Sequence, residues 1–228
     1  MRSYQFYLVS TPIGNLGDIS ERAIEVLKGV DEILSEDKRK AGVLLSRYGI
    51  GTKLGSYHDH NKEKVTPSIM ERIAEGVRFA LISDAGTPVI SDPGYYIVRE
   101  LIRNGIDFTA IPGPTSITDA LVLSGLPPDR FSFLGYLPRK KGKRDKMLIE
   151  VGEREETIIL FESPFRLLKT LQAIDRLLGD RDVVIARELT KMHEEVRRGS
   201  ARELMEHFQG GKIRGELTVL IRGLGRRK

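Results

Sequence analysis

Residues 79–94 read FALISDAGTPVISDPG and join the two signals that decide the fold. The first four residues are apolar, which is typical of a buried strand. The twelve residues that follow are rich in glycine, which permits positive φ angles, and in proline, which fixes φ. Such a loop holds backbone N–H and C=O groups in set directions at the end of a strand. Ligands of open α/β sheets bind at that place.

Two further Gly/Pro-rich loops, at residues 10–15 and 112–116, also follow apolar runs. One such loop is most often an ordinary turn, but three of them at strand ends favour a nucleotide-like ligand. The sequence contains neither a Walker A motif nor a dinucleotide fingerprint after a strand, and the three loops contain no Lys or Arg. Their Asp84 and Asp92 instead suit a ligand that carries a positive charge or hydroxyl groups.

Strand-like runs alternate with helix-like runs along the whole chain, which is typical of α/β architecture. We predict strands at residues 6–9, 32–34, 79–82, 108–111, 131–134, 157–161, 183–186 and 217–221, and helices at 145–151, 164–178 and 201–208. Two more helices are predicted to begin at Asp18, with Glu21 completing a capping box, and at Thr66-Pro67. Pro-containing pairs punctuate the middle of the chain, so we predict two α/β domains at residues 1–114 and 115–228.

Composition excludes several classes of protein. The 228 residues are 40% hydrophobic and 30% charged, which is a globular composition with enough chain to bury a core. The absence of cysteine excludes disulfides and thiolate metal sites. We find no signal-peptide pattern at the start and no run of about 18 apolar residues. We therefore expect a cytoplasmic protein with no membrane partner.

Positive charge is concentrated in one segment. Residues 139–146 contain six basic residues and one acidic residue, so this segment alone accounts for the net charge of +5. A solvated loop and a patch that binds phosphate backbones both explain such a run. Its position between two predicted elements, and not in a tail, favours the phosphate-binding interpretation.

Six stretches, taken in order, resemble the tetrapyrrole methylase superfamily, and most closely its branch of small-subunit (16S) ribosomal RNA (cytidine 2′-O)-methyltransferases. They are residues 10–16 (STPIGNL), 36–39 (EDKR), 58–61 (HDHN), 83–88 (SDAGTP), 161–166 (FESPFR) and 186–191 (ARELTK). Two positions depart from the family pattern. Lys38 stands where the family has Thr, and Phe165 stands where many members have His, so position 165 offers no histidine base.

The resemblance implies a two-domain α/β fold of the class III S-adenosylmethionine methyltransferases, with the cofactor in the cleft between the domains, and a homodimer. Carried over by motif, the cofactor contacts are Pro12, Ile13, Gly14, Asp84, Gly86, Thr87, Val89, Ile90, Ser116, Ile117, Phe161, Ala186 and Leu217. The acidic loops also suit the cationic sulfonium, so the physical interpretation and the resemblance agree.

The resemblance also implies methylation of a cytidine ribose in the decoding centre of 16S ribosomal RNA, as naked RNA or in the assembled 30S subunit. A base or hydrogen-bond acceptor should assist the weakly acidic hydroxyl, and the candidates are Asp37, His58, His60 and Glu188. Residues expected to hold RNA phosphates are Arg39, Arg139, Lys140, Lys141, Lys143 and Arg144. A His-x-His pair supplies two ligands, too few for a metal site, and we expect no metal.

Two other functions remain open. A methylase of the same superfamily that acts on a corrinoid or porphyrin precursor would share the cofactor loops. The basic segment and the 36–39 and 58–61 stretches favour RNA over that alternative. A non-enzymatic RNA-binding module on the ribosome is the third possibility, and the intact 83–94 loop argues against it.

Overall fold

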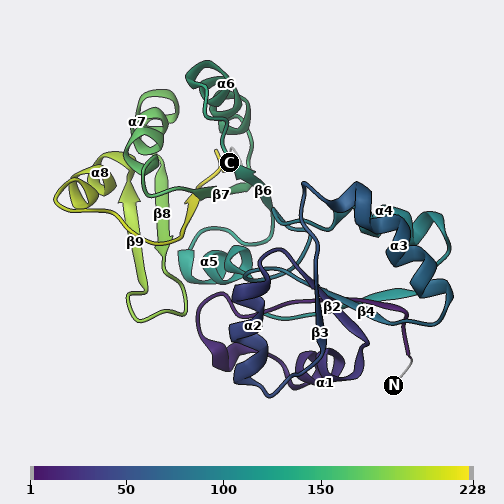
Figure 1. Cartoon of the computed structure of the whole chain (residues 1–228). Helices are drawn as coiled ribbons and strands as arrows, with labels where there is room; N and C mark the ends of the chain where they lie inside the picture. Colours follow the sequence, from purple (N-terminus) through teal and green to yellow (C-terminus); the bar gives the residue numbers. More distant parts are fainter. Residues whose placement is uncertain (1–2, 226–228) are drawn as a thin grey trace. The chain divides into compact units, whose positions relative to one another are not determined.

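The computed structural model describes residues 3–225, which form two compact units, Met1–Thr115 (unit 1) and Ser116–Lys228 (unit 2) (Figure 1). Each unit contains one five-stranded sheet with helices packed against it. The α/β class is therefore confirmed. The prediction that the two halves are separate domains stays a prediction.

The sheet of unit 1 is entirely parallel, in the order β3-β2-β4-β1-β5. Its strands are β1 (Phe6–Val9), β2 (Glu32–Ser35), β3 (Lys53–Ser56), β4 (Phe79–Ile82) and β5 (Phe108–Ile111). The helices are α1 (Glu21–Gly29), α2 (Lys38–Arg47), α3 (Lys62–Ala74) and α4 (Tyr95–Arg103), with a short 3₁₀ helix at Leu16–Asp18. Because all the strands point the same way, the loops that follow them meet at one edge of the sheet.

Strand β4 shows why its residues are apolar without alternation. Ala80 and Ile82 pack into the core that α1 and α2 cover, whereas Phe79 and Leu81 pack into the core that α3 and α4 cover. A strand that is buried on both faces needs apolar side chains at every position.

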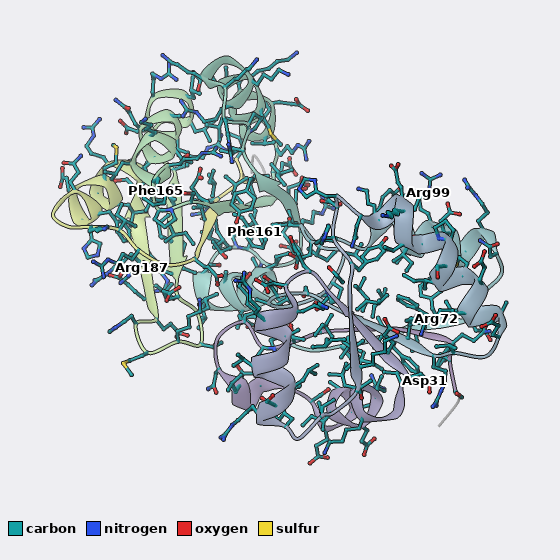
Figure 2. The ribbon with its side chains drawn as sticks, viewed as in Figure 1. Asp31, Arg72, Arg99, Phe161, Phe165 and Arg187 are labelled. Carbon is teal, nitrogen blue, oxygen red and sulfur yellow. The ribbon has the colours of Figure 1, made fainter. Side chains whose placement is uncertain are left out.

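A buried carboxylate fixes the register at the edge of this sheet. Glu32 of β2, with a side chain 8% exposed, accepts ion pairs from Lys53 (2.9 Å) and Arg72 (2.8 Å; Figure 2). Burial raises the pKa of Glu32, but the hydrogen bonds and charges of Lys53 and Arg72 outweigh it, so its pKa lies below the usual value. A Cβ atom at Gly55 would lie 2.5 Å from Oε1 of Glu32, so only glycine leaves room for this carboxylate.

The sheet of unit 2 is mixed, in the order β6-β7-β10-β8-β9. Its strands are β6 (Phe131–Tyr136), β7 (Thr157–Glu162), β8 (Asp182–Arg187), β9 (Glu195–Ser200) and β10 (Leu217–Ile221). Strands β6 and β7 are parallel, and β10 is antiparallel to both β7 and β8. Strands β6, β7 and β8 therefore end at the same end of the sheet, where β9 and β10 begin.

Three helices, α6 (Lys141–Gly152), α7 (Leu167–Leu178) and α8 (Ala201–Gln209), share one core with this sheet. Helix α5 (Ser116–Ser124) contacts β8, β9 and β10. The guanidinium of Arg198 in β9 donates to the carbonyl oxygens of Ser124 (3.0 Å) and Leu123, which satisfies the last turn of α5.

Both helix starts predicted in unit 1 are wrong, and in unit 2 helix α7 begins at Leu167 and not at residue 164. Helix α1 begins after Ser20, whose hydroxyl accepts the backbone N–H of Ala23, and Asp18 lies in the 3₁₀ helix. Helix α3 begins at Lys62, so Pro67 lies inside the helix and not in its first turn. The Thr66 hydroxyl donates to the carbonyl of Lys62 (2.6 Å) beside the proline.

The structure also adds elements that the sequence patterns did not predict. They are β3, β9, α2, α4 and α5. The segment expected as a basic loop is mostly helix, because α6 begins at Lys141 and not near Asp145. Among residues 3–225, none of the helices combines the length and apolar character that a membrane crossing requires.

Candidate active site

The first and second loops of unit 1 are joined by a backbone bridge. The N–H of Thr11 donates to the carbonyl of Gly86 (2.9 Å), and the N–H of Gly86 donates to the carbonyl of Thr11 (3.0 Å). The hydroxyls of Ser10 and Thr87 lie 3.0 Å apart and share a hydrogen bond. The cofactor contacts predicted at 12–14 and 84–90 thus lie in two loops that are fixed to each other.

The loop after β4 contains strained backbone. Val89 has φ 79° and Ser91 has φ 60°, and positive φ at a β-branched residue is a genuine outlier. Residues held in this way cost about 1–3 kcal/mol each and cluster at functional sites. Gly94, at φ 139°, permits the fold of the loop, since a Cβ there would lie 2.8 Å from Cγ2 of Val89.

The third loop closes against the other two. A Cβ at Gly113 would lie 2.9 Å from Cβ of Ser10, and one at Gly86 would lie 3.3 Å from Cγ2 of Ile13 and 3.7 Å from the carbonyl oxygen of Pro114. Gly86 also has φ 78°, which side chains rarely adopt. All three loops follow neighbouring strands, β4, β1 and β5. Together the three loops form a concave backbone surface, called the cradle below, which a side chain at Gly86 or Gly113 would fill.

The predicted cofactor residues of unit 2 lie on three adjacent strands and one helix. Phe161 of β7 and Ala186 of β8 both lie opposite Thr218 of β10, next to Leu217. Ser116 and Ile117 begin α5, which contacts β8 and β10. The structure therefore groups the unit 2 residues that the resemblance placed at the cofactor.

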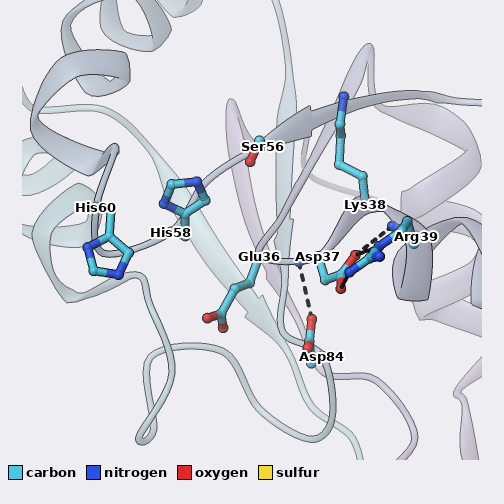
Figure 3. Close-up of a pocket in the computed structure, with 8 residues that line it drawn as sticks. All are labelled: Glu36, Asp37, Lys38, Arg39, Ser56, His58, His60 and Asp84. Atoms are coloured by element: carbon cyan, nitrogen blue, oxygen red, sulfur yellow. Dashed lines mark hydrogen bonds and ion pairs between the residues drawn. The ribbon is translucent and has the colours of Figure 1, made fainter.

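A polar pocket of about 570 Å³ lies in unit 1, beside the loop after β4 (Figure 3). Its lining comes from the ends of β2, β3 and β4 and from the first turn of α2, and consists of Glu36, Asp37, Lys38, Arg39, Ser56, His58, His60 and Asp84. The pocket therefore contains three residues predicted as catalytic, one predicted to bind RNA and one predicted to bind cofactor.

Asp37 is occupied by local interactions. Its carboxylate caps α2 by accepting the backbone N–H of Arg39 (2.9 Å) and is paired with the Arg39 guanidinium (3.1 Å). These contacts lower the pKa of Asp37 to about 2, with the side-chain hydrogen bond from Arg39 as the main cause. A carboxylate with so low a pKa is a weak base at neutral pH. Arg39, in turn, is exposed but held by Asp37.

Glu36, by contrast, is free. It is exposed and, among residues 3–225, has no hydrogen bond or ion pair. Figure 3 shows its carboxylate extending to the side of the pocket where His58 and His60 lie, whereas Asp37 turns toward Arg39. Sequence reasoning singled out the Glu36-Asp37 pair but assigned the catalytic role to Asp37 alone.

The two histidines lie together, with ring centroids 6.0 Å apart. The backbone N–H of His58 donates to Oδ1 of Asn61 (2.9 Å), which holds the turn before α3. Nδ1 of His58 is buried and has no hydrogen-bond partner within the described part of the chain. Buried polar atoms are nearly always paired, so this atom is suited to a partner from a ligand.

Asp84 connects the pocket to the predicted cofactor loop. Its carboxylate accepts an ion pair from Lys40 (2.7 Å) and a long hydrogen bond from the backbone N–H of Asp37 (3.4 Å). The charge of Asp84 is thus shared with Lys40, which sequence reasoning missed. Lys40 directly follows the 36–39 stretch, and that adjacency was the available signal.

Glu188 directly follows β8 in unit 2. Its Oε1 accepts the backbone N–H of Glu216 (2.9 Å) and the Nζ of Lys191 (2.9 Å). Burial raises the pKa of Glu188, but the N–H of Glu216 and the Lys191 ammonium outweigh it and lower the pKa. A Cβ at Gly215 would lie 2.4 Å from Cδ of Glu188, so the chain is shaped around this side chain. These contacts favour a structural role over that of a base.

The basic segment forms the start of α6. Lys140 is its N-cap residue and makes no side-chain capping bond, and the first turn contains no acidic residue. Arg139, Lys140, Lys141 and Lys143 are exposed, whereas Arg144 is mostly buried and paired with Asp145 (3.2 Å). Cations at a helix N-terminus oppose the helix dipole, so this arrangement favours an anion there. Among residues 3–225, no group of three His, Asp or Glu side chains is placed to hold a metal ion.

Comparisons with known proteins agree with these features. Residues 5–205 match the family model of the Tetrapyrrole (Corrin/Porphyrin) Methylases. Ribosomal RNA small subunit methyltransferase I of Thermotoga maritima is 46% identical over 216 residues, which cover 95% of this chain and 97% of that protein. The protein of the same name from Halalkalibacterium halodurans is 46% identical over 219 residues, covering 96% of this chain and 76% of that protein.

The solved structure of a cobalamin biosynthetic enzyme, cobalt precorrin-4 methyltransferase, shares the fold, with a TM-score of 0.71 at 19% identity over 95% of this chain and 94% of that one. The methylase fold predicted from the sequence motifs is confirmed, and so is the resemblance to the ribosomal RNA branch. The chain therefore belongs to the tetrapyrrole methylase family and, within it, to the branch of small-subunit ribosomal RNA methyltransferases.

Proposed function

We propose that this protein is an S-adenosylmethionine-dependent methyltransferase that methylates the 2′-hydroxyl of a cytidine in the decoding centre of 16S ribosomal RNA. The observation that carries the proposal is the sharing of Asp84. This residue lies both in the strained loop predicted to hold the cofactor and in the wall of the polar pocket that contains Glu36, His58 and His60. The names of the relatives support ribosomal RNA as the substrate.

The residues present fit the cofactor. The cradle at Gly86 would be filled by a Cβ, and the backbone groups around it are held in fixed directions by the Thr11 bridge. Residues 12–14 and 84–90 would hold the cofactor in unit 1, and Ser116, Ile117, Phe161, Ala186 and Leu217 would hold it in unit 2. When bound, S-adenosylmethionine supplies an electrophilic methyl group on a sulfonium.

The pocket of unit 1 would receive the ribose. A ribose hydroxyl is weakly acidic, so a side chain that accepts its proton or a hydrogen bond assists its attack. Glu36 has a free carboxylate and His58 has an unpartnered Nδ1, so these groups are better suited to accept than Asp37 or Glu188. His60 lies beside them and would contact the same substrate. The remaining rate enhancement comes from alignment of the hydroxyl.

The start of α6 would contact the RNA backbone. Four exposed cations and the unpaired N–H groups of the first turn attract phosphate oxygens. These contacts fix the position of the RNA without reading its sequence. We further propose that the enzyme is a cytoplasmic homodimer, for which sedimentation at micromolar concentration is the test. A species of 25.6 kDa alone would contradict it.

A methylation assay tests the function. Radiolabelled S-adenosylmethionine is offered with naked 16S RNA, with 30S subunits that lack the modification, and with uroporphyrinogen or precorrin substrates. Label at a cytidine 2′-oxygen in either RNA sample supports the proposal, and the two samples show whether the assembled subunit is required. Label only in the tetrapyrrole would contradict it. Cofactor binding without any methylation would contradict it too, and no cofactor binding would favour a non-enzymatic module.

A further inference from the structure

One end of the unit 2 sheet gathers loops that are far apart in sequence. Tyr136 of β6 is opposite Phe161 of β7, and Leu217 of β10 lies between Glu162 and Arg187. The segments 137–140, 163–166, 188–194 and 210–216 therefore all leave the sheet at this end. Strands β6 and β8 are three spacings apart, or about 14 Å.

A second cationic site lies at this end of the sheet, near β8, whereas α6 begins after β6 at the opposite edge. A pocket of about 560 Å³ is lined by Arg187, Glu188, His193, Lys212 and Arg214. Nothing in the function proposed above uses its three basic residues.

The acidic residues around this pocket are already occupied. Glu188 is held by Lys191. Glu195 forms ion pairs with Arg187 (2.8 Å) and Arg197 (2.8 Å) and a hydrogen bond with Nε2 of His207 (2.9 Å). Burial raises the pKa of Glu195, but these partners together outweigh it and lower the pKa to about 2. The Glu195 carboxylate therefore stays ionised and holds Arg187 in place at the pocket wall.

Lys212 and Arg214 are not compensated. Both are exposed, and within residues 3–225 neither the Lys212 ammonium nor the Arg214 guanidinium forms an ion pair. The carbonyl of Arg214 accepts a hydrogen bond from Arg187 (3.4 Å), which ties this loop to β8. Two unpaired cations beside a fixed arginine form a site for the oxygens of a phosphate group.

Between the two cationic sites lies an exposed aromatic ring. Phe165 is 88% exposed in the loop that follows β7 (Figure 2). The residue after it, Arg166, is anchored by Glu162 (3.3 Å) and by the carbonyl of Leu137 (2.7 Å), so the loop is held while the ring faces solvent. Exposed aromatic rings flanked by cations are the usual platform for unstacked bases of single-stranded RNA.

We propose that this end of unit 2 binds a single-stranded segment of the substrate RNA, with phosphates held by Arg187, Lys212 and Arg214 and a base stacked on Phe165. This inference rests on the proposed function, because it names a second contact surface for the same RNA. It extends the RNA interface from the start of α6 across the sheet. Double-stranded RNA cannot stack a base on Phe165, because the bases of a duplex are already stacked on one another.

The experiment uses the full-length protein and a fluorescent oligoribonucleotide with the single-stranded decoding-centre sequence of 16S RNA. Its affinity is measured by anisotropy at salt concentrations from about 50 to 200 mM. In K212A/R214A we expect affinity to fall on the order of tenfold and the slope of log K against log salt to decrease by about 1.4, for two contacts to single-stranded RNA. In F165A we expect a loss of about five- to hundredfold with an unchanged slope, because stacking involves no counterion release. F165W should restore the affinity.

The matched controls are K169A/R202A, which removes two cations from α7 and α8, and I102A, which removes an exposed apolar side chain from α4. Both should bind RNA as the wild type does, and all variants should bind S-adenosylmethionine unchanged. If K212A/R214A and F165A bind RNA with wild-type affinity and slope while the wild type methylates 16S RNA, the second surface is wrong and the proposed function stands. If the wild type neither binds nor methylates RNA, both are overturned. A loss in K169A/R202A equal to that in K212A/R214A would also overturn the surface, since it would reflect net charge alone. A loss in I102A equal to that in F165A would do the same, since it would reflect any exposed apolar side chain.

Discussion

The loops at the strand ends of unit 1 are shaped by backbone, whereas those of unit 2 carry side-chain charge. In unit 1, the loop after β4 has positive φ at Val89 and Ser91, and the charge of Asp84 is met by Lys40. In unit 2, Lys212 and Arg214 have no ion-pair partner within the described residues. Fixed backbone suits a small ligand of one shape, and uncompensated cations suit a long polyanion of many conformations. In the function proposed above, the fixed backbone of unit 1 would shape part of the cofactor site, and the unpaired cations of unit 2 would hold RNA phosphates.

The largest effect that this comparison predicts is at Gly86. Gly86→Val should reduce affinity for S-adenosylmethionine by more than about a hundredfold, because the new side chain would fill the cradle next to Ile13. Isothermal titration calorimetry measures this affinity. The control is Gly105→Val, since Gly105 also has positive φ (66°) but has no atom within 4 Å of its Cβ position. A folded Gly86→Val protein that binds the cofactor normally would refute the site.

The second effect concerns the stability of unit 1. Glu32→Gln should lower the free energy of unfolding by about 2 kcal/mol, since the hydrogen bonds of Lys53 and Arg72 to a charged carboxylate are lost. The folded-state pKa of Glu32 is lowered, so its contribution is complete above the unfolded pKa and is lost as pH falls through the folded value. Urea unfolding between pH 3 and 7 should therefore show a flatter acid limb in the variant. An acid limb identical to that of the wild type would exclude this role for Glu32.

The third effect separates RNA binding from cofactor binding. Replacing Arg139, Lys140 and Lys143 with Ala should weaken RNA binding on the order of tenfold and reduce the salt slope by roughly three times 0.7 to 0.9. Cofactor affinity should hardly change, since exposed charges are screened beyond about 10 Å at moderate salt. Parallel salt slopes for the variant and the wild type, together with more aggregation of the variant, would show that the segment is merely solubilising.

The smallest effect is expected at Asp37. Asp37→Asn should change the methylation rate less than about threefold, because Asn caps a helix as well as Asp does. The low pKa of Asp37, about 2, also leaves it ionised throughout the pH range of the assay, so the pH profile should keep its shape. Glu36→Gln should lower the rate more. A loss of a hundredfold or more in Asp37→Asn would restore Asp37 as the general base.

The sequence predicted the apolar strands and missed the polar ones. All eight predicted strands are present, because apolar runs report burial directly. The edge strands β3 (KLGS) and β9 (EVRRGS) were missed because they consist mostly of charged and small residues, which protect a sheet edge but are also typical of loops. The other two edge strands, β5 (FTAI) and β6 (FSFLGY), contain enough apolar residues to be predicted. Helix starts were misplaced because Ser20 competes with Asp18 as a cap, and local sequence does not rank such candidates.

In the candidate site, too, local sequence patterns were predicted correctly and long-range contacts were not. The loops were predicted correctly as strand ends, since glycine and proline mark them. The sequence did not predict that the Glu36 carboxylate is free and the Asp37 carboxylate is paired. The two residues are adjacent, and they differ only because Asp37 caps α2 and turns toward Arg39. Lys40 and Lys212 were missed for a related reason. Whether a cation is paired depends on residues such as Asp84, which lies 44 positions along the chain.

The pairing of β1 has a consequence for how the chain is made. This apolar strand, Phe6–Val9, hydrogen-bonds only to β4 and β5 within the sheet, so Phe6 meets its partners at Phe79 and Phe108. During synthesis from the N-terminus, β1 therefore leaves the ribosome long before either neighbour exists. Non-local parallel pairing of this kind forms slowly and leaves apolar segments exposed to aggregation. Until residue 111 has emerged, β1 therefore lacks at least one of its two partners in the sheet.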